Sequence, residues 1–394
     1  MKHKNLKNLP LKGIKVLDAA SYIAAPLVSA LMTDYGAEVI KIESHTGDTY
    51  RDAVKGGHVW PESEMDWAFI LENRNKRSLS IDLKTEEGQI ILKKLVKESD
   101  VLITNMPGEP RKKLGLDESK IRKMNKKIIY ASLTAYGEKG PDSKRTAFDA
   151  TAYYARSGLM EWSKTNNADD HPPFPIPGGG DHPTGLSLFT SILLALINRE
   201  KTGKGMFIDV SMLDCQIAIL ENAIARYLSK NEIPQPMGSR HPSIAPFEAF
   251  KTKDSYIIIA AGNDKLFEKL CNALDMKAEF NNEKFKTNAL RCKNMDELKL
   301  IMEKKLKVLN TKEWTQKLEK DKIPCGPIFN IKDAVENPQI KARNMIINTF
   351  HKVAGDFKAA GNPIKMSSYA DSLKRGDVPD LDENREKIIK EFCN

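Results

Sequence analysis

The sequence predicts an α/β fold, with a doubly wound parallel sheet followed by a second, smaller α+β block. Two observations predict it. Short apolar runs typical of buried strands alternate with helical segments over roughly the first 130 residues. The composition then changes near residue 230, where residues 231–242 are rich in Pro and Gly and indicate a domain crossing. A chain of 394 residues, 41% hydrophobic and 29% charged, is long enough for two globular domains.

The first unit of this fold is a strand, a helix and a second strand. Residues 13–18 are typical of a buried strand, residues 25–35 of a helix that Gly36 ends, and residues 38–43 of the next strand. The turn at 19–25 lacks GxGxxG, and no GxxxxGK followed by Ser or Thr occurs in the chain. Ordinary dinucleotide binding is therefore disfavoured.

The same rhythm continues with a strand at 77–83, an amphipathic helix at 86–97, and strands at 100–104 and 127–132. In a doubly wound sheet, ligands bind beyond the carboxyl ends of the parallel strands. The candidate binding segments are therefore those that follow the strands, namely residues 21–25, 44–49, 105–108 and 134–140.

The second half of the chain begins with a strongly apolar helix near Asp181 and a polar turn at 200–205. A strand at 207–212 and one long helix at 213–229 follow. The smaller block, residues 247–320, is predicted to hold a strand at 256–261 and helices at 265–274, 295–309 and 311–320. A charged helix at 383–392 ends the pattern.

Asp181 is the carboxylate with the most informative surroundings, because it stands between the glycines 178–180 and the start of the apolar helix. Glycines let a backbone adopt positive φ and approach a ligand closely. A carboxylate at a helix N-cap accepts hydrogen bonds from free amides at the positive end of the dipole, so Asp181 is expected to be ionised. An ionised Asp181 could act as a carboxylate nucleophile. The alternative is that Asp181 only caps the helix and has no catalytic role.

Composition excludes several other classes of protein. The net charge is +9, but the lysines are spread among glutamates and no nucleic-acid motif accompanies them, so no nucleic-acid partner is expected. No apolar run is long enough to span a membrane, and the N-terminus lacks the apolar core of a signal peptide, so the protein is expected to be cytoplasmic. The five cysteines are scattered without zinc-ligand spacing, so neither disulfides nor a metal are expected.

Taken together, the motifs resemble the class III (CaiB/BaiF-type) CoA-transferase family over nearly the whole chain. The resemblance is carried by the order of many short motifs: GAEVIKIE at 36–43, NRNKRS at 73–78, DVLITN at 100–105, YGEKGP at 136–141, Phe148-Asp149, Gly180-Asp181 with Thr184-Gly185, and KTGKG at 201–205. It is similar to formyl-CoA transferase and to family members that exchange CoA among dicarboxylic acids.

The resemblance implies a Rossmann-like large domain, an inserted small α+β domain, and two chains interlocked as rings in a homodimer. The expected boundaries are 1–200 for the first part of the large domain, 201–232 for a linker, 233–330 for the small domain and 331–394 for the return to the large domain. It also implies that Asp181 attacks an acyl-CoA to form a mixed aspartyl anhydride and then an aspartyl-CoA thioester. CoA and small carboxylic acids are then substrates, and no permanently bound cofactor is expected.

The CoA-binding positions also follow from the resemblance, because the family's CoA cleft lies beyond the first strands. They are Ile23, Ala24, Ser44, Ile81, Asp82, Leu83, Lys84, Asn105, Met106, Pro107, Lys113, Thr134, Ala135, Tyr136 and Gly137. Positions expected to orient the acyl group are Asp149, Gly179 and Gly180. Some relatives have Arg where Ser44 stands, so the clamp on the 3′-phosphate is expected from Lys41, His45 or Arg51. The glycine-rich lid loop of formyl-CoA transferase has no counterpart in residues 237–246.

The roles of three residues expected near the site, Asp149, Tyr136 and His182, need separate comment. Asp149 positions the acyl group or begins a helix, and Tyr136 donates to an oxyanion or packs at the end of the sheet. His182 lies beside the nucleophile on a different side of the turn and is not expected to be catalytic.

Two other functions stay open at this stage. An α-methylacyl-CoA racemase shares the fold but has a histidine directly before its aspartate, where this chain has Phe148, so its proton-transfer pair is incomplete. The second is a CoA-binding protein without turnover. The sequence does not name the acids that are exchanged.

Overall fold

The computed structural model describes residues 9–51, 67–165, 171–173, 176–352, 355–369 and 375–393. The chain divides into two compact units. Unit 1 comprises residues 1–160, 174–233 and 339–394, and unit 2 comprises residues 161–173 and 234–338. Unit 1 is thus built from segments far apart in the sequence.

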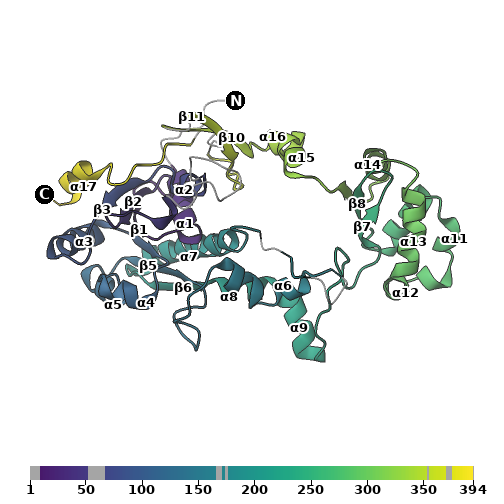
Figure 1. Ribbon diagram of the computed structural model, residues 1–394, viewed down its shortest axis with the longest axis horizontal. Coiled ribbons are helices and arrows are strands. Elements are labelled where there is room, and N and C mark those ends of the chain that lie inside the picture. Colours follow the sequence, from purple (N-terminus) through teal and green to yellow (C-terminus); the bar gives the residue numbers. More distant parts are fainter. Residues whose placement is uncertain are drawn as a thin grey trace. The chain divides into compact units, whose positions relative to one another are not determined.

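Unit 1 contains a six-stranded sheet in the order β3-β2-β1-β4-β5-β6 (Figure 1). All five neighbouring pairs are parallel. The strands are β1 (Lys15–Ala19), β2 (Glu38–Glu43), β3 (Arg77–Ser80), β4 (Val101–Thr104), β5 (Ile129–Thr134) and β6 (Phe207–Ser211). This is the doubly wound topology that the alternating strands and helices predict, and its switch point lies between β1 and β4.

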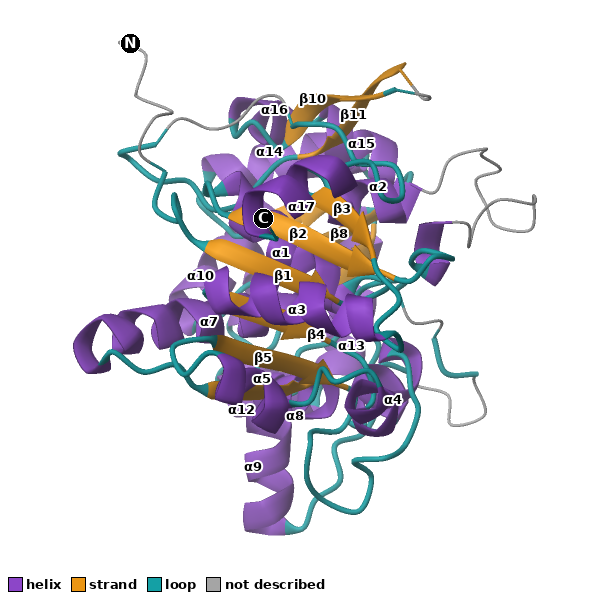
Figure 2. Cartoon of the chain, turned by 90° about the vertical axis from the view of Figure 1, so that its left-hand side faces the viewer, coloured by secondary structure: helices purple, strands orange, loops and turns teal. Residues whose placement is uncertain are grey.

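Helices cover both faces of the sheet because alternate strand residues point to opposite sides. Val16 packs with α1 (Ala24–Asp34), α7 (Asp181–Thr202) and α8 (Met212–Ile219). Leu17 packs on the other face with α3 (Glu86–Glu98), α5 (Glu118–Met124) and α17 (Arg385–Phe392). Figure 2 shows α3 and α17 in front of the strands.

The C-terminal segment closes the β3 edge of the sheet. The backbone amide of Ser78 donates to Asn384 Oδ1 at 2.8 Å, and that of Ser80 donates to Asp382 Oδ1 at 2.8 Å. These bonds pair amides that a sheet edge would otherwise leave open. They explain why residues after 339 belong to unit 1 although they follow unit 2 in the sequence.

Unit 2 has its own sheet and its own core. Its antiparallel strands are β7 (Phe247–Lys251), β8 (Tyr256–Ala260) and β9 (Cys325–Pro327). Phe250, Ile257 and Trp314 are part of the core that its helices share with the sheet. Those helices are α10 (Asp264–Ala273), α11 (Lys277–Phe280), α12 (Asn288–Lys293), α13 (Met295–Leu306) and α14 (Thr311–Lys320), with a short turn at Glu283–Phe285 and α15 (Ile331–Glu336) after β9.

The remaining elements of the described chain are short. They are Thr49–Arg51, α2 (Trp67–Asn73), α4 (Gly108–Lys113), the π-helical turn η3 (Ala150–Ala155), α6 (Leu159–Trp162), α9 (Glu221–Lys230), α16 (Pro338–Ala342) and the hairpin β10 (Ile346–His351) and β11 (Gly355–Ala360).

Two expectations are corrected here. The expected linker 201–232 contains β6, α8 and α9, and β6 pairs with β5 inside the large sheet. The long helix expected at 213–229 is two helices, because the backbone at Leu220 leaves helical geometry (φ −83°, ψ 13°). A polar turn alone does not mark a domain boundary when the next strand joins the same sheet.

Charged side chains are buried beneath the loop that follows β1. Lys76 Nζ donates to Asp18 Oδ2 at 2.7 Å and also to Pro26 O, while Lys41 Nζ donates to Ala20 O. Both lysine side chains are fully buried. Burial raises the pKa of Asp18, but the neighbouring Lys76 and Lys41 outweigh it and hold that pKa below its ordinary value. The network fixes the carboxyl end of β1 and the start of α1.

Replacing Lys76 with methionine is expected to lower the free energy of unfolding by about 3–5 kcal/mol, because Asp18 stays buried without its closest partner. Urea unfolding measures this loss. The double variant Lys76→Met/Asp18→Asn should recover part of it, since it removes the unpaired charge. A loss below about 1 kcal/mol in the single variant would contradict the role given to this pair.

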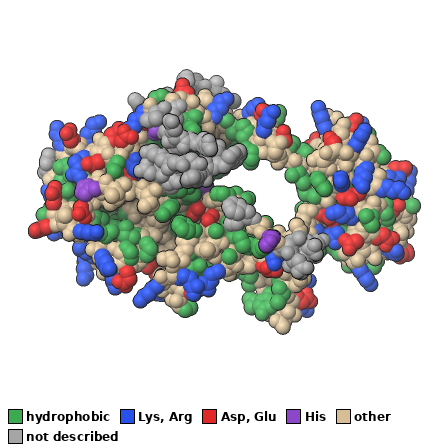
Figure 3. Space-filling view, viewed as in Figure 1, with side chains coloured by type: hydrophobic (Ala, Val, Ile, Leu, Met, Phe, Trp, Pro, Cys, Tyr) green, Lys and Arg blue, Asp and Glu red, His purple; other side chains and the backbone are tan. Residues whose placement is uncertain are grey.

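On the face shown in Figure 3, Lys and Arg lie scattered among Asp and Glu and form no single basic patch. In the described residues, no helix is long and apolar enough to cross a membrane.

Candidate active site

Asp181 is the first residue of α7, and the preceding Gly180 is the N-cap. The start of α7 packs against the start of α1, since a Cβ on Gly185 would come within 2.7 Å of Ala24 O. Because α1 follows β1 directly, this contact places Asp181 at the carboxyl edge of the sheet. That edge is where a doubly wound sheet binds its ligands.

The glycine turn before Asp181 is tightly packed. Gly178 has φ of 72°, which favours glycine, and its position lies near Ile23. A Cβ on Gly179 would meet Tyr154 Oη at 2.1 Å, and a Cβ on Gly180 would meet Asp149 Cβ at 2.8 Å. The glycines are therefore required by conformation at Gly178 and by packing at Gly179 and Gly180.

Two amides of this turn are already used within the fold. The Gly179 amide donates to Ile176 O at 2.8 Å, and the Gly180 amide donates to Asp149 Oδ2 at 3.2 Å. Neither is free to donate to an acyl oxygen in this arrangement. Contact of Gly179 and Gly180 with the acyl group stays a prediction.

Asp149 links the glycine turn before Asp181 to the π-helical turn η3. Its Oδ1 accepts the Ala150 amide at 2.7 Å as an N-cap, and its Oδ2 accepts the Gly180 amide. The side chain thus begins a helix and also lies beside the glycine turn that precedes Asp181. Phe148 precedes it, is 61% exposed, and makes an edge-to-face contact with Tyr22 after β1.

The electrostatics of Asp181 differ from the expectation of an ionised cap. No side chain caps α7, and Asp181 is half-buried. Burial raises the pKa of Asp181 to about 7, with Asp149 and Glu72 adding to the rise and His182 opposing it. The expectation was wrong because it counted the helix dipole but not the burial and the two neighbouring acids.

The family resemblance implies that Asp181 is acylated, and the pKa of Asp181 predicts the pH dependence of that step. A carboxylate is nucleophilic only when ionised, and a pKa raised from 3.8 to about 7 leaves Asp181 protonated below that pH. The single-turnover rate of acyl transfer from acyl-CoA to the protein should therefore rise through about pH 7 and level off above it. A rate already at its plateau at pH 5 would contradict this environment for Asp181.

His182 and Glu72 form the other side of the turn. His182 Nδ1 lies 2.9 Å from Gly178 O, and Nε2 lies 3.4 Å from Glu72 Oε1 on α2. The hydrogen bond with Glu72 raises the pKa of His182 to about 9. Both ring nitrogens are thus engaged.

Nearly all predicted CoA positions lie where parallel strands end, at one edge of the sheet. Ile23 and Ala24 follow β1, Ser44 follows β2, Ile81, Asp82, Leu83 and Lys84 follow β3, Asn105, Met106 and Pro107 follow β4, and Thr134, Ala135, Tyr136 and Gly137 end or follow β5. Ser44, Lys84 and Pro107 are exposed there. Lys113 is also exposed but lies at the far end of α4.

Asn105 joins two of these segments at the switch point of the sheet. Its Oδ1 accepts the Ser21 amide at 3.0 Å, and its Nδ2 donates to Ser21 O at 2.7 Å. Tyr136 has a different setting, since it is buried in the core on the α7 face and the Arg156 guanidinium lies 5.0 Å from its ring centre. That geometry favours the packing role weighed for Tyr136.

The three candidates for the phosphate clamp differ in access. Lys41 is fully buried and paired with Asp48, so it is not available to a ligand. Arg51 is held by both oxygens of Glu43 at 2.7 Å. His45 is exposed, and its Nδ1 lies 2.9 Å from Ser80 Oγ. Of the three, His45 remains accessible.

Sequence analysis missed several side chains of this site, namely Glu72, Tyr153 and Tyr154. Glu72 carried no signal, because its contact with His182 joins positions 110 apart in the sequence. Tyr153 and Tyr154 belong to η3, and their packing on the glycines appears only in three dimensions. The run of glycines was the available signal, because residues without a side chain leave room for large side chains to pack against the turn before Asp181.

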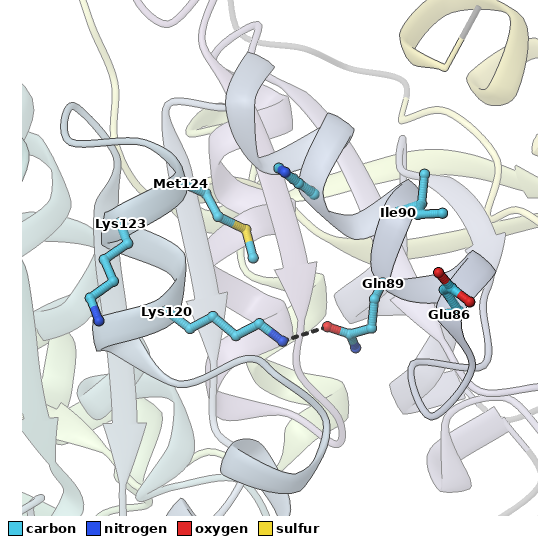
Figure 4. Close-up of a pocket in the computed structure, with 7 residues that line it drawn as sticks. Glu86, Gln89, Ile90, Lys120, Lys123 and Met124 are labelled. Atoms are coloured by element: carbon cyan, nitrogen blue, oxygen red, sulfur yellow. Dashed lines mark hydrogen bonds between the residues drawn. The ribbon is translucent and has the colours of Figure 1, made fainter.

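A separate groove lies between α3 and α5 and has a volume of about 480 Å³. Figure 4 shows Lys120 pointing to Gln89, with Glu86, Ile90, Lys123 and Met124 around them. It is lined by neither Asp181 nor any predicted CoA residue, so we do not assign the active site to it. Within the described ranges, no group of His, Cys, Asp and Glu could hold a metal ion.

Comparisons with known proteins show the family to which this chain belongs. The model of CoA-transferase family III matches residues 11–385. The chain is 35% identical to succinyl-CoA:glutarate CoA-transferase of Homo sapiens, covering 97% of this chain and 86% of that protein. It is 34% identical to acetyl-CoA:oxalate CoA-transferase of Acetobacter aceti, covering 98% of this chain and 96% of that protein.

A solved structure extends the similarity to three dimensions. The crystal structure of a CaiB/BaiF family protein from Brucella suis superposes with a TM-score of 0.84 and 34% sequence identity. The match covers 98% of this chain and 100% of that one.

Proposed function

Because this chain belongs to CoA-transferase family III and is therefore a CoA-transferase, we propose that it moves CoA from an acyl-CoA to a free carboxylic acid through covalent intermediates on Asp181. The observation that carries this proposal is the half-buried Asp181 carboxylate at the start of α7, beside the loop after β1. A desolvated and oriented carboxylate is a far better nucleophile than one in water.

The proposed reaction has four steps. Asp181 attacks the thioester carbonyl, the C–S bond breaks, and a mixed anhydride and CoA thiolate form. The thiolate then attacks the Asp181 carbonyl and releases the donor acid, leaving an aspartyl-CoA thioester. The acceptor carboxylate attacks that thioester, giving a second mixed anhydride and the thiolate. Attack of the thiolate on the acceptor carbonyl forms the new acyl-CoA and frees the Asp181 carboxylate.

Short dicarboxylic acids are the proposed substrates, with succinyl-CoA as donor. The support is that relatives at 34–35% identity are named for succinyl-CoA with glutarate and acetyl-CoA with oxalate. A further relative, from Haloarcula marismortui, is named succinyl-CoA:mesaconate CoA-transferase at 30% identity. The CoA moiety would lie along the carboxyl edge, over the predicted positions that follow β1 to β5.

Mass spectrometry of the Asp181 peptide tests this proposal. The protein is incubated with succinyl-, acetyl- or a branched acyl-CoA, without acceptor, and hydroxylamine is added as a trap. A hydroxamate or CoA adduct on Asp181 with succinyl-CoA is the expected result. An unmodified Asp181 with all three donors, together with exchange of the α-proton into solvent, would instead favour racemase chemistry.

We also propose that two chains assemble as a homodimer. Leu194 and Ile197 on α7 are 63% and 56% exposed, and Leu228 on α9 is 76% exposed. Large apolar side chains exposed on neighbouring elements are typical of an interaction surface. Sedimentation of the protein should give the mass of a dimer, and a monomer at micromolar concentration would contradict it.

A further inference from the structure

A buried carboxylate lies beneath the nucleophile turn without the partners that burial normally requires. Glu72 on α2 is 6% exposed, and its Oε2 is buried with no hydrogen-bond partner in the described structure. Its Oε1 lies 3.4 Å from His182 Nε2. Burying a charged group costs free energy unless the group is paired. His182 makes the ion-pair contact with Glu72, and Lys76 and Arg375 interact with Glu72 electrostatically.

The protonation of His182 follows from its two contacts. Nδ1 faces Gly178 O, which only accepts, so Nδ1 carries a proton. Nε2 faces a carboxylate, which favours a second proton there. The ring is therefore an imidazolium held at both nitrogens. Both N–H groups face acceptors of the protein and not a substrate, and the ring fixes a positive charge next to Asp181.

We propose that the Glu72–His182 pair is a positioning device, which fixes the Gly178–Asp181 turn and keeps a cation beside Asp181 that favours its carboxylate over the neutral acid. Neither residue touches the reacting atoms. Glu72 acts through His182, and His182 acts on Asp181. This inference rests on the proposed role of Asp181 as nucleophile.

The charges around Asp181 explain why the cation is needed. Asp149 at the start of η3 and Glu72 on α2 both favour the neutral acid, as does burial. Tyr154 on η3 also faces Asp181 and is uncharged at neutral pH. Lys76 and Arg375 interact with Glu72 and not with Asp181. His182 is thus the group in the described site that favours the carboxylate.

Two variants of His182 separate charge from geometry. His182→Gln removes the charge, and His182→Lys keeps it but loses the imidazole contacts. The readout is the single-turnover rate of Asp181 acylation by succinyl-CoA between pH 5 and 9, with hydroxylamine trapping. We expect His182→Gln to move the acid limb of this profile upward by about one unit or more, so that activity is restored at high pH. His182→Lys should lower the plateau and leave the limb in place.

Each outcome decides the matter. A uniform loss at all pH values in both variants, or an unmoved limb in His182→Gln, would mean a structural role and overturn the inference. If His182→Gln does not fold, nitrogen NMR of the wild-type imidazole replaces it. A doubly protonated ring at pH 8 supports the inference, and a neutral one overturns it. Failure to trap any adduct on wild-type Asp181 would instead count against the proposed function.

Discussion

Replacing Asp181 with alanine is expected to abolish CoA transfer, lowering kcat by at least about 10³-fold, because it removes the proposed nucleophile. The affinity for CoA and the assembly of the protein should change little, since the predicted CoA positions are held by the sheet and not by Asp181. Steady-state kinetics and calorimetric titration with CoA measure the two effects separately.

The same variant has a predicted effect on stability. The folded-state pKa of Asp181, about 7, lies above its unfolded value near 3.8. The stabilising effect of the neutral acid is complete below about pH 4 and is lost as the pH rises through 7. Between pH 5 and pH 8 the Tm of the Asp181→Ala variant should therefore rise relative to wild type.

A matched control is Asp214→Ala. Asp214 also lies in the first turn of a helix, α8, but is exposed. Its replacement should leave both kcat and the pH dependence of Tm close to wild type. Retained turnover in Asp181→Ala would remove this residue from the nucleophile role.

The second large effect is expected for Gly180→Ala. Gly180 has φ of −92°, a conformation that alanine adopts, so the substitution tests packing and not backbone strain. The added methyl group would meet Tyr153 Cγ at 2.7 Å and Asp149 Cβ at 2.8 Å. Either η3 or the start of α7 must move, which should cost about 1–3 kcal/mol of stability.

Gly180→Ala should also lower kcat, and this is the larger expected effect of the substitution. Displacing Asp181 by about 1 Å from its attack position can cost about 10²-fold in kcat. The control is Gly262→Ala, because Gly262 has no positive φ and no neighbouring atom within 4 Å of the added Cβ. Wild-type kcat in Gly180→Ala, with its stability reduced, would show that the turn tolerates movement.

Several features of the fold could be predicted from the sequence because they depend on local pattern. The strands β1, β2, β4 and β5 are short apolar runs, helix α1 follows β1 and helix α3 precedes β4, so the type and order of these elements are visible in the residues. The break between α8 and α9 at Leu220 is not visible in the sequence, because the two helices together have the length and composition of one helix. The hairpin of β10 and β11 was also missed, because its strands are half-exposed and carry no continuous apolar run.

For the site, the sequence determined the residue types and tertiary structure determined their chemistry. Asp181 and its glycines form a local motif, and parallel strands necessarily end at one edge, so the positions of Asp181 and of the loops at that edge follow from the chain. The pKa of Asp181 cannot be predicted from the sequence. It depends on Asp149, Glu72 and burial, which come from η3, α2 and the packing of α7. Electrostatic energy depends on distance in space and on access to water, and neither is written in the order of the residues.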